Sequence, residues 1–163
     1  MPRLQPIVVA LLLTVLTAPP SGGESSGTEA EIVAFFEAYA AHAVALDWEG
    51  LLALYADDAR FHWMESGHLA YADKASVVEH IHTLAPMIER LAFDVSEPRV
   101  LVLSEEHAHA SLRFRETVTL VSGESIDLEG AITALLVRTA EGWRLLSGHT
   151  SISPPPPPSD AEA

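Results

Sequence analysis

Glu116 is the first residue whose position could support chemistry. It lies in the stretch 108–121, where apolar and polar residues alternate as in a strand. Since every second residue of a strand points to the same side, Glu116 shares a face with Leu112 and Phe114. A carboxyl group on an apolar face loses hydration, which raises its pKa and makes it a candidate general acid or base. The alternatives are that a bulge turns Glu116 outward, or that an arginine such as Arg138 pairs with it.

His149 is the second candidate for a chemical role. It lies in the closing stretch 143–151, and by the same period it shares a face with Trp143, Leu145 and Ser147. If that face is the inner one, the imidazole could donate a hydrogen bond to a ligand or relay a proton. The alternative is a core histidine that bonds only to its neighbours.

The eight histidines do not have the spacing of a metal site. His80 and His82 point in different directions on a predicted helix, whereas His107 and His109 could face one side of a strand. Two histidines fall short of the usual set of about three or four ligands, unless an acid such as Asp127 joins them from a neighbouring strand. We therefore expect no metal and no cofactor. The chain also lacks cysteine and a Gly-x-Ser-x-Gly motif, so nucleophilic catalysis has no candidate.

Three predicted helices come first among the elements that must position these side chains. Residues 28–31 fit a capping box and lead into apolar residues at helical spacing. Asp47 is a candidate cap for a second, shorter helix. A third helix is predicted over 74–91, with a kink or an early end at Pro86.

The second half of the sequence has the periodicity of strands. After a short strand at 60–65 and a turn at Ser66-Gly67, strands are predicted at 99–103, 108–121, 126–139 and 143–151. The short connections indicate an antiparallel meander, and strands longer than about ten residues indicate a strongly bent sheet. The order of elements predicts an α+β fold with the helices packed against one face of the sheet.

Composition limits the class of protein. The chain has 163 residues, enough for one domain with a sizeable core, and no cysteine, so disulfides and a lipid-modified cysteine are excluded. Asp and Glu number 23 against 9 Lys and Arg, a formal net charge of −14. This balance argues against nucleic acid and against anionic membrane surfaces as partners.

Both ends of the chain differ from the middle. Arg3 is the only charge before the apolar run 7–16, which is too short to span a bilayer but suits the core of a secretory signal. We predict a signal peptide over 1–23, hence export to the periplasm or the outside, and a linker over 24–27; a retained membrane anchor is the alternative. Residues 153–163 carry a run of prolines directly after Ser153 and are predicted to be a disordered tail, or else a motif for a proline-binding partner.

Three segments, at 47–50, 54–61 and 143–151, carry a family resemblance. They read Asp-Trp-Glu-Gly between two helices, Leu-Tyr-Ala-Asp-Asp-Ala-Arg-Phe leading into a strand, and Trp-Arg-Leu-Leu-Ser-Gly-His-Thr-Ser at the end. Their order and spacing resemble the nuclear transport factor 2-like superfamily, in its SnoaL-like and ketosteroid-isomerase-like branch, over 28–152. The resemblance implies a cone-shaped α+β barrel, with three N-terminal helices packed on a strongly curved, mixed but mainly antiparallel sheet, and a homodimer.

The resemblance also bears on two site residues. Ketosteroid isomerases use a tyrosine on the first helix and a carboxylate base on the first strand, and alignment through 55–59 puts these positions at Tyr39 and Trp63. Tryptophan cannot abstract a proton, and the position of the second acid of those enzymes falls near Leu135, which is apolar. Isomerase activity by that mechanism is therefore not expected.

Together these features predict an exported domain that binds a small, largely apolar molecule in a cone pocket. The residues placed in the pocket are Tyr39, Trp63, Glu116 and His149. One alternative is an enzyme (an isomerase, cyclase or hydrolase) that uses Glu116 or His149 as its acid or base. The other is a non-catalytic dimeric scaffold. Neither the ligand nor any catalytic residue is fixed by the sequence.

Overall fold

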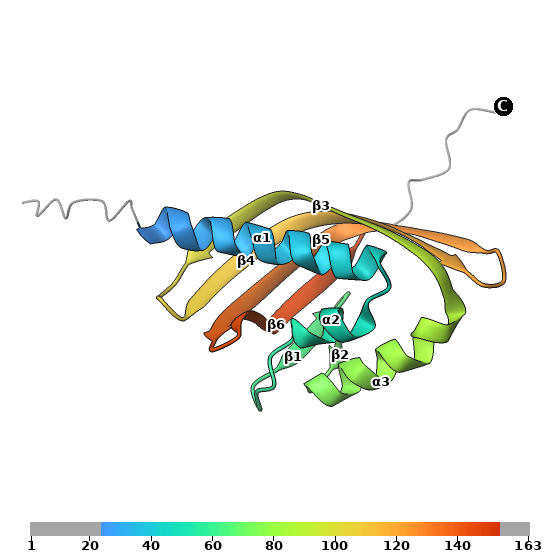
Figure 1. Cartoon of the computed structure of the whole chain (residues 1–163), viewed down its shortest axis with the longest axis horizontal. Coiled ribbons are helices and arrows are strands. Elements are labelled where there is room, and N and C mark those ends of the chain that lie inside the picture. The colour runs from blue at the N-terminus through green and yellow to red at the C-terminus, as the bar shows by residue number, and fades with distance from the viewer. Residues whose placement is uncertain (1–23, 154–163) are drawn as a thin grey trace, which may run out of the picture.

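The computed structural model describes residues 24–153, in which three helices cover one side of a six-stranded sheet (Figure 1). The helices are α1 (Glu24–Val44), α2 (Trp48–Ala53) and α3 (Lys74–Leu84). The predicted signal peptide and nearly all of the predicted proline-rich tail lie outside the described residues. Within the described range, no helix combines the length and the apolar character that a membrane crossing would need.

The first two helices differ in how well their starts were predicted. α1 begins before the capping box at 28–31, so residues 24–27 belong to the helix, and the expectation of a linker there is wrong. α2 begins where predicted, because the carboxylate of Asp47 accepts a hydrogen bond from the backbone N–H of Gly50 at 3.0 Å.

The third helix is shorter than the sequence pattern predicted. Asp73 caps it, accepting from the backbone N–H of Ser76 at 2.8 Å. Pro86 has no N–H and cannot continue the helix, so a 3-10 turn, η1 (Ala85–Met87), ends it. β3 (Ile88–Val102) follows at once, which makes the predicted helix over 88–91 and the predicted strand start at 99 both wrong.

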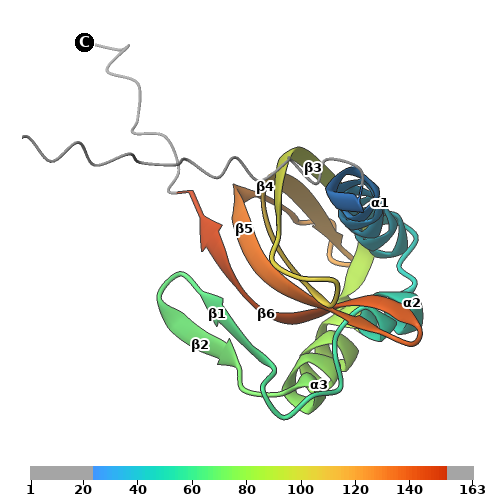
Figure 2. The same ribbon diagram turned by 90° about the vertical axis from the view of Figure 1, so that its left-hand side faces the viewer.

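The sheet is mixed but mainly antiparallel, as predicted. Its strand order is β2-β1-β6-β5-β4-β3, and only β1 and β6 are parallel among the described neighbours. Figure 2 shows the sheet curling from β3, beside α1, round to β1 and β2, with α2 and α3 on its concave side. The other strands are β1 (His62–Glu65), β2 (His68–Tyr71), β4 (His107–Leu120), β5 (Ser125–Thr139) and β6 (Gly142–Ile152). β2 was not predicted.

The concave face of the sheet carries the core. Its buried residues alternate along β4 and β5 as expected for strands, and they pack against apolar residues of α1. The prediction for the inner face of β4 is confirmed. These core residues are Ala108, Ala110, Leu112 and Phe114 on β4, Ile132, Ala134 and Leu136 on β5, and Ile32, Phe35 and Phe36 on α1.

A bulge in β6 changes which of its residues face inward. Leu136 of β5 pairs with Leu145, but the preceding Leu135 pairs with Ser147, so Leu146 is an extra residue with no partner on β5. One extra residue exchanges the two faces of everything that follows it in the strand. Beyond the bulge, Thr150 therefore faces inward, and the residues directly before and after it face outward.

Candidate functional site

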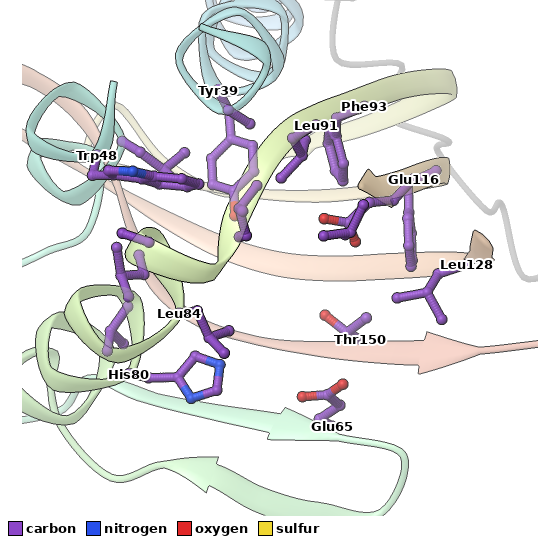
Figure 3. A pocket seen from close by; sticks show the side chains of 18 of the residues that line it. Tyr39, Trp48, Glu65, His80, Leu84, Leu91, Phe93, Glu116, Leu128 and Thr150 are labelled. Carbon is purple, nitrogen blue, oxygen red and sulfur yellow. The ribbon is translucent and has the colours of Figure 1, made fainter. Parts of the chain in front are cut away.

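A cavity of about 400 Å³ lies between the concave face of the sheet and the three helices. Most of its wall is apolar and aromatic, and a few polar groups point into it (Figure 3). The polar or partly polar side chains on the wall are Tyr39, Trp48, Tyr55, Trp63, Glu65, Tyr71, His80, Glu116 and Thr150. Such a cavity, with few polar groups, is the usual form of a site for a small molecule.

Tyr39 lies on the cavity wall, as predicted, and it is paired with Tyr55. The two hydroxyl oxygens are 2.9 Å apart. Tyr55 follows α2 and is held against β6, because the backbone groups of Leu54 and Ala56 on either side of it bond to Leu145. Burial raises the pKa of Tyr39 and raises that of Tyr55 well above its ordinary value. Both phenols stay protonated at neutral pH. One proton serves the bond between them, which leaves the other for a ligand.

Trp63 also lies on the wall, where its indole is fixed from two sides. Its Nε1–H donates to Thr150 Oγ1 at 3.0 Å, across the parallel pair of β1 and β6. Its ring packs against Gly148, where a Cβ atom would come within 2.4 Å of the ring. Because its N–H is already used, Trp63 contributes an apolar surface and not a donor.

Glu116 points into the cavity from β4, as the alternation predicted (Figure 3). Its cross-strand partners are Phe93 and Leu128, both apolar. Burial, and after it the nearby carboxylate of Glu65, raise the pKa of Glu116. This is the environment of a carboxyl group that holds its proton to a higher pH than a solvated one, as a general acid or base requires.

The alternative of an arginine partner for Glu116 does not hold. Arg138 pairs instead with Glu31 of α1, and its guanidinium lies 4.6 Å from the ring centroid of Trp143. The indole N–H of Trp143 donates to the same carboxylate at 2.9 Å. No ion pair or side-chain hydrogen bond within residues 24–153 involves Glu116.

His149 is on the opposite face of the sheet from Glu116, contrary to our expectation. It follows the extra residue Leu146, so it pairs with Thr133 on the outer face, while the next residue, Thr150, points into the cavity. The expectation that His149 lines the pocket is therefore wrong, and with it the role of His149 as acid or base in that pocket.

Several polar residues that line the cavity were missed from the sequence, Glu65 and His80 among them. Glu65 follows Trp63 by two positions in β1, so the period of two puts both on the inner face. His80 lies one helical turn before Leu84 on α3, and its ring centroid is 5.4 Å from that of Tyr71. Burial, and then Glu65, raise the pKa of Tyr71 to about 12.

The histidines outside the cavity do not form a metal centre in the described structure. No group of three or more potential ligands comes together among residues 24–153. His107 lies near the hydroxyl of Ser104, at 3.4 Å, and His42 pairs with Asp47 at 2.7 Å.

The model of the SnoaL-like domain matches residues 32–155. No curated protein matches the chain by sequence.

Solved structures share the fold at low identity. A nuclear transport factor 2-like superfamily protein of Salmonella enterica serovar Typhimurium has a TM-score of 0.69 at 14% identity, over 85% of this chain and 99% of that one. A hexachlorocyclohexane dehydrochlorinase of Novosphingobium barchaimii has 0.65 at 13%, over 80% and 90%. A protein of Kribbella flavida has 0.68 at 18%, over 80% and 93%. At these identities the likeness establishes a common fold.

Proposed function

The chain belongs to the SnoaL-like domain family, and we propose that it binds a small, largely apolar molecule in the cavity under its sheet. One observation carries this proposal: the cavity of about 400 Å³ has an apolar, aromatic wall into which only a few polar groups converge. Glu116 and the Tyr39–Tyr55 pair are the groups that would orient the ligand. Apolar burial would supply most of the affinity.

The size of the cavity weighs against a non-catalytic scaffold. A domain that served only as a scaffold would gain stability by filling its interior, because each unfilled volume of a core costs free energy. Here the large side chains of the wall surround a volume that none of the described residues fills. A retained cavity favours a domain that receives a ligand.

The binding proposal is tested with N-phenyl-1-naphthylamine, an uncharged dye that fluoresces in apolar sites. We expect the dye to bind the wild type and to be displaced by 4-phenyl-1-butanol. In Val118→Trp, an indole would occupy the cavity, and dye binding should be lost. Thr119→Trp is the control, because Thr119 pairs with Arg90 and Ser125 on the outer face. Equal dye binding by both variants would reject the cavity as the site.

Proton transfer at Glu116 is a second candidate function. Its support is a carboxyl group of raised pKa that faces the cavity with no partner among the described residues. Such a group, once ionised, could take a proton from the carbon atom adjacent to the one that carries a leaving group. The C–H electrons would then form the double bond as the leaving group departs with its own pair.

Solved relatives of this fold include hexachlorocyclohexane dehydrochlorinases, which suggests a first substrate to try. Chloride release from hexachlorocyclohexane, lost in Glu116→Gln, would support an elimination. Release no faster than in buffer alone would reject dehydrochlorination for this chain.

We also propose that the domain acts after export. The support is the sequence of 1–23, with Arg3, the apolar run 7–16 and the small residues that follow it. N-terminal sequencing of the protein from its native host should find a mature chain that starts near residue 24. A chain that keeps Met1 in the soluble fraction of the cell would contradict export.

A further inference from the structure

Two carboxyl groups face the cavity from strands that lie apart in the sheet but share its concave face. Glu116 lies on β4 and Glu65 on β1, and β5 and β6 separate these strands in the sheet. Because the sheet curls, both side chains point into the same space, with Thr150 between them (Figure 3). Their proximity has an electrostatic consequence, since Glu65 raises the pKa of Glu116.

No fixed cation balances these two acids within the described structure. Among the described residues that line the cavity there is no lysine or arginine. Lys74, at the start of α3, donates to the backbone oxygen of Tyr55 at 2.9 Å. His80 is the one basic side chain on the described wall, and it is exposed at the side of the cavity formed by α3.

The rest of the wall suits a positive charge as well. Aromatic rings from helices and strands surround the space next to the acids. Tyr39 and Phe93 lie with their ring centroids 5.8 Å apart, and Phe93 stacks on Phe114 at the same distance. The faces of such rings attract a cation, most strongly where water is excluded. An anionic ligand would meet two acids and the negative faces of these rings.

We propose that the cavity selects an apolar molecule that carries a protonated amine, with the ammonium group bound between Glu65 and Glu116. This inference rests on the proposed function, that the cavity receives a small apolar molecule, and it adds the chemical class of that molecule. An ammonium group offsets the negative charge of the pair and gives each carboxyl group an N–H donor. Charge-assisted hydrogen bonds of this kind are about twice as strong as those between neutral groups.

Three probes of closely similar size and shape test the selectivity: 4-phenylbutylamine, 4-phenyl-1-butanol and 4-phenylbutyrate. Each displaces N-phenyl-1-naphthylamine from the wild-type protein at pH 7, and its dissociation constant is measured. We expect the amine to bind at least about tenfold more tightly than the alcohol, as for hydrogen bonds to charged groups, and the carboxylate to bind most weakly.

The double variant Glu65→Gln/Glu116→Gln keeps the shape of both side chains and removes their charge. It should bind the alcohol as the wild type does and lose the preference for the amine. Glu129→Gln is the matched control, because it removes a charge from an exposed residue that faces Arg115 at 3.6 Å, and it should keep the preference.

Each outcome separates the inference from the proposal on which it rests. If the alcohol binds the wild type as tightly as the amine, or if the double variant keeps the preference, the amine inference is overturned while the binding proposal stands. If neither the dye nor any of the probes binds the wild type, the binding proposal itself is rejected, and the inference with it.

Discussion

Glu116 shows how a residue at a proposed site can oppose stability. A strand face that carries Leu112 and Phe114 would be better packed with another apolar residue at position 116. The carboxyl group instead faces a cavity, half-buried, without a partner among the described residues. Local sequence choices that conflict with the fold in this way are typical of functional sites.

The raised pKa of Glu116 predicts a pH dependence of stability. In the folded state this group holds its proton to a higher pH than in the unfolded chain, where its pKa is about 4.3. As the pH rises through that interval, the folded state binds more protons than the unfolded state, so stability falls. Glu116→Gln cannot ionise and should escape this loss.

Urea denaturation between pH 4 and 8 measures this effect. The free energy of unfolding of Glu116→Gln should exceed that of the wild type at pH 7, and the excess should shrink as the pH falls to 4. An excess that does not change with pH would mean that Glu116 is solvated or paired in the folded protein.

Gly148 is a second residue whose type the cavity wall requires. A Cβ atom there would lie 2.4 Å from Cζ3 of Trp63 and 2.6 Å from the backbone oxygen of Thr133. Since a backbone atom cannot swing aside, Gly148→Ala should destabilise the protein by about 1–3 kcal/mol, the usual cost of overpacking. Gly27→Ala is the control, because nothing lies within 4 Å of a Cβ at that helical position. Equal urea midpoints for both variants would contradict the packing of Trp63 on Gly148.

At the scale of elements, periodicity predicted β4, β5 and β6 well but did not reveal the extra residue in β6. The inner face of β4 follows directly from alternation, and that places Glu116 correctly. In β6 the doublet Leu145-Leu146 marks the bulge, but β5 contains the doublet Leu135-Leu136 with no extra residue. The two cannot be told apart without the register, which is why His149 was assigned to the wrong face.

The predicted boundary between α3 and β3 was wrong for a related reason. Ile88 and Leu91 continue the helical spacing of Val77, Ile81 and Leu84, yet Leu91 and Phe93 also fit the period of a strand. Pro86 decides between the two, because it ends the helix and lets Ile88 start the strand. An apolar pattern that satisfies both periods needs such a breaker to be read correctly.

The bond between Trp63 and Thr150 joins β1 to β6 and can be tested alone. Thr150→Val keeps the shape of the side chain but leaves the indole N–H without its acceptor, so it should destabilise the protein by about 1 kcal/mol. Thr150→Ser keeps the hydroxyl and should recover most of the loss. Guanidinium unfolding followed by tryptophan fluorescence gives both values. If the valine and serine variants had the same midpoint, the hydrogen bond would contribute nothing to stability.

At the scale of the whole molecule, the cone-shaped α+β architecture predicted by resemblance is confirmed. The sheet has a concave face that holds the cavity and a convex face that no described element covers (Figure 2). On the convex face, one row across the strands runs through Leu101, His109, Leu135, Ser147 and His62. It contains no lysine, arginine, aspartate or glutamate, in a chain of net charge −14.

A row free of formal charge across the outer face of a highly acidic protein is suited to contact a second copy of the chain, and we propose a homodimer through this row. Leu135 lies on the central strand β5, so Leu135→Arg would bring two guanidinium groups together across a two-fold axis and should give a monomer. Thr119→Arg, near the end of β4, adds the same charge away from that row and should leave the dimer intact. Sedimentation velocity distinguishes the two masses. A wild type that sediments as a monomer would exclude the dimer, and a Leu135→Arg variant that remains dimeric would place the interface elsewhere.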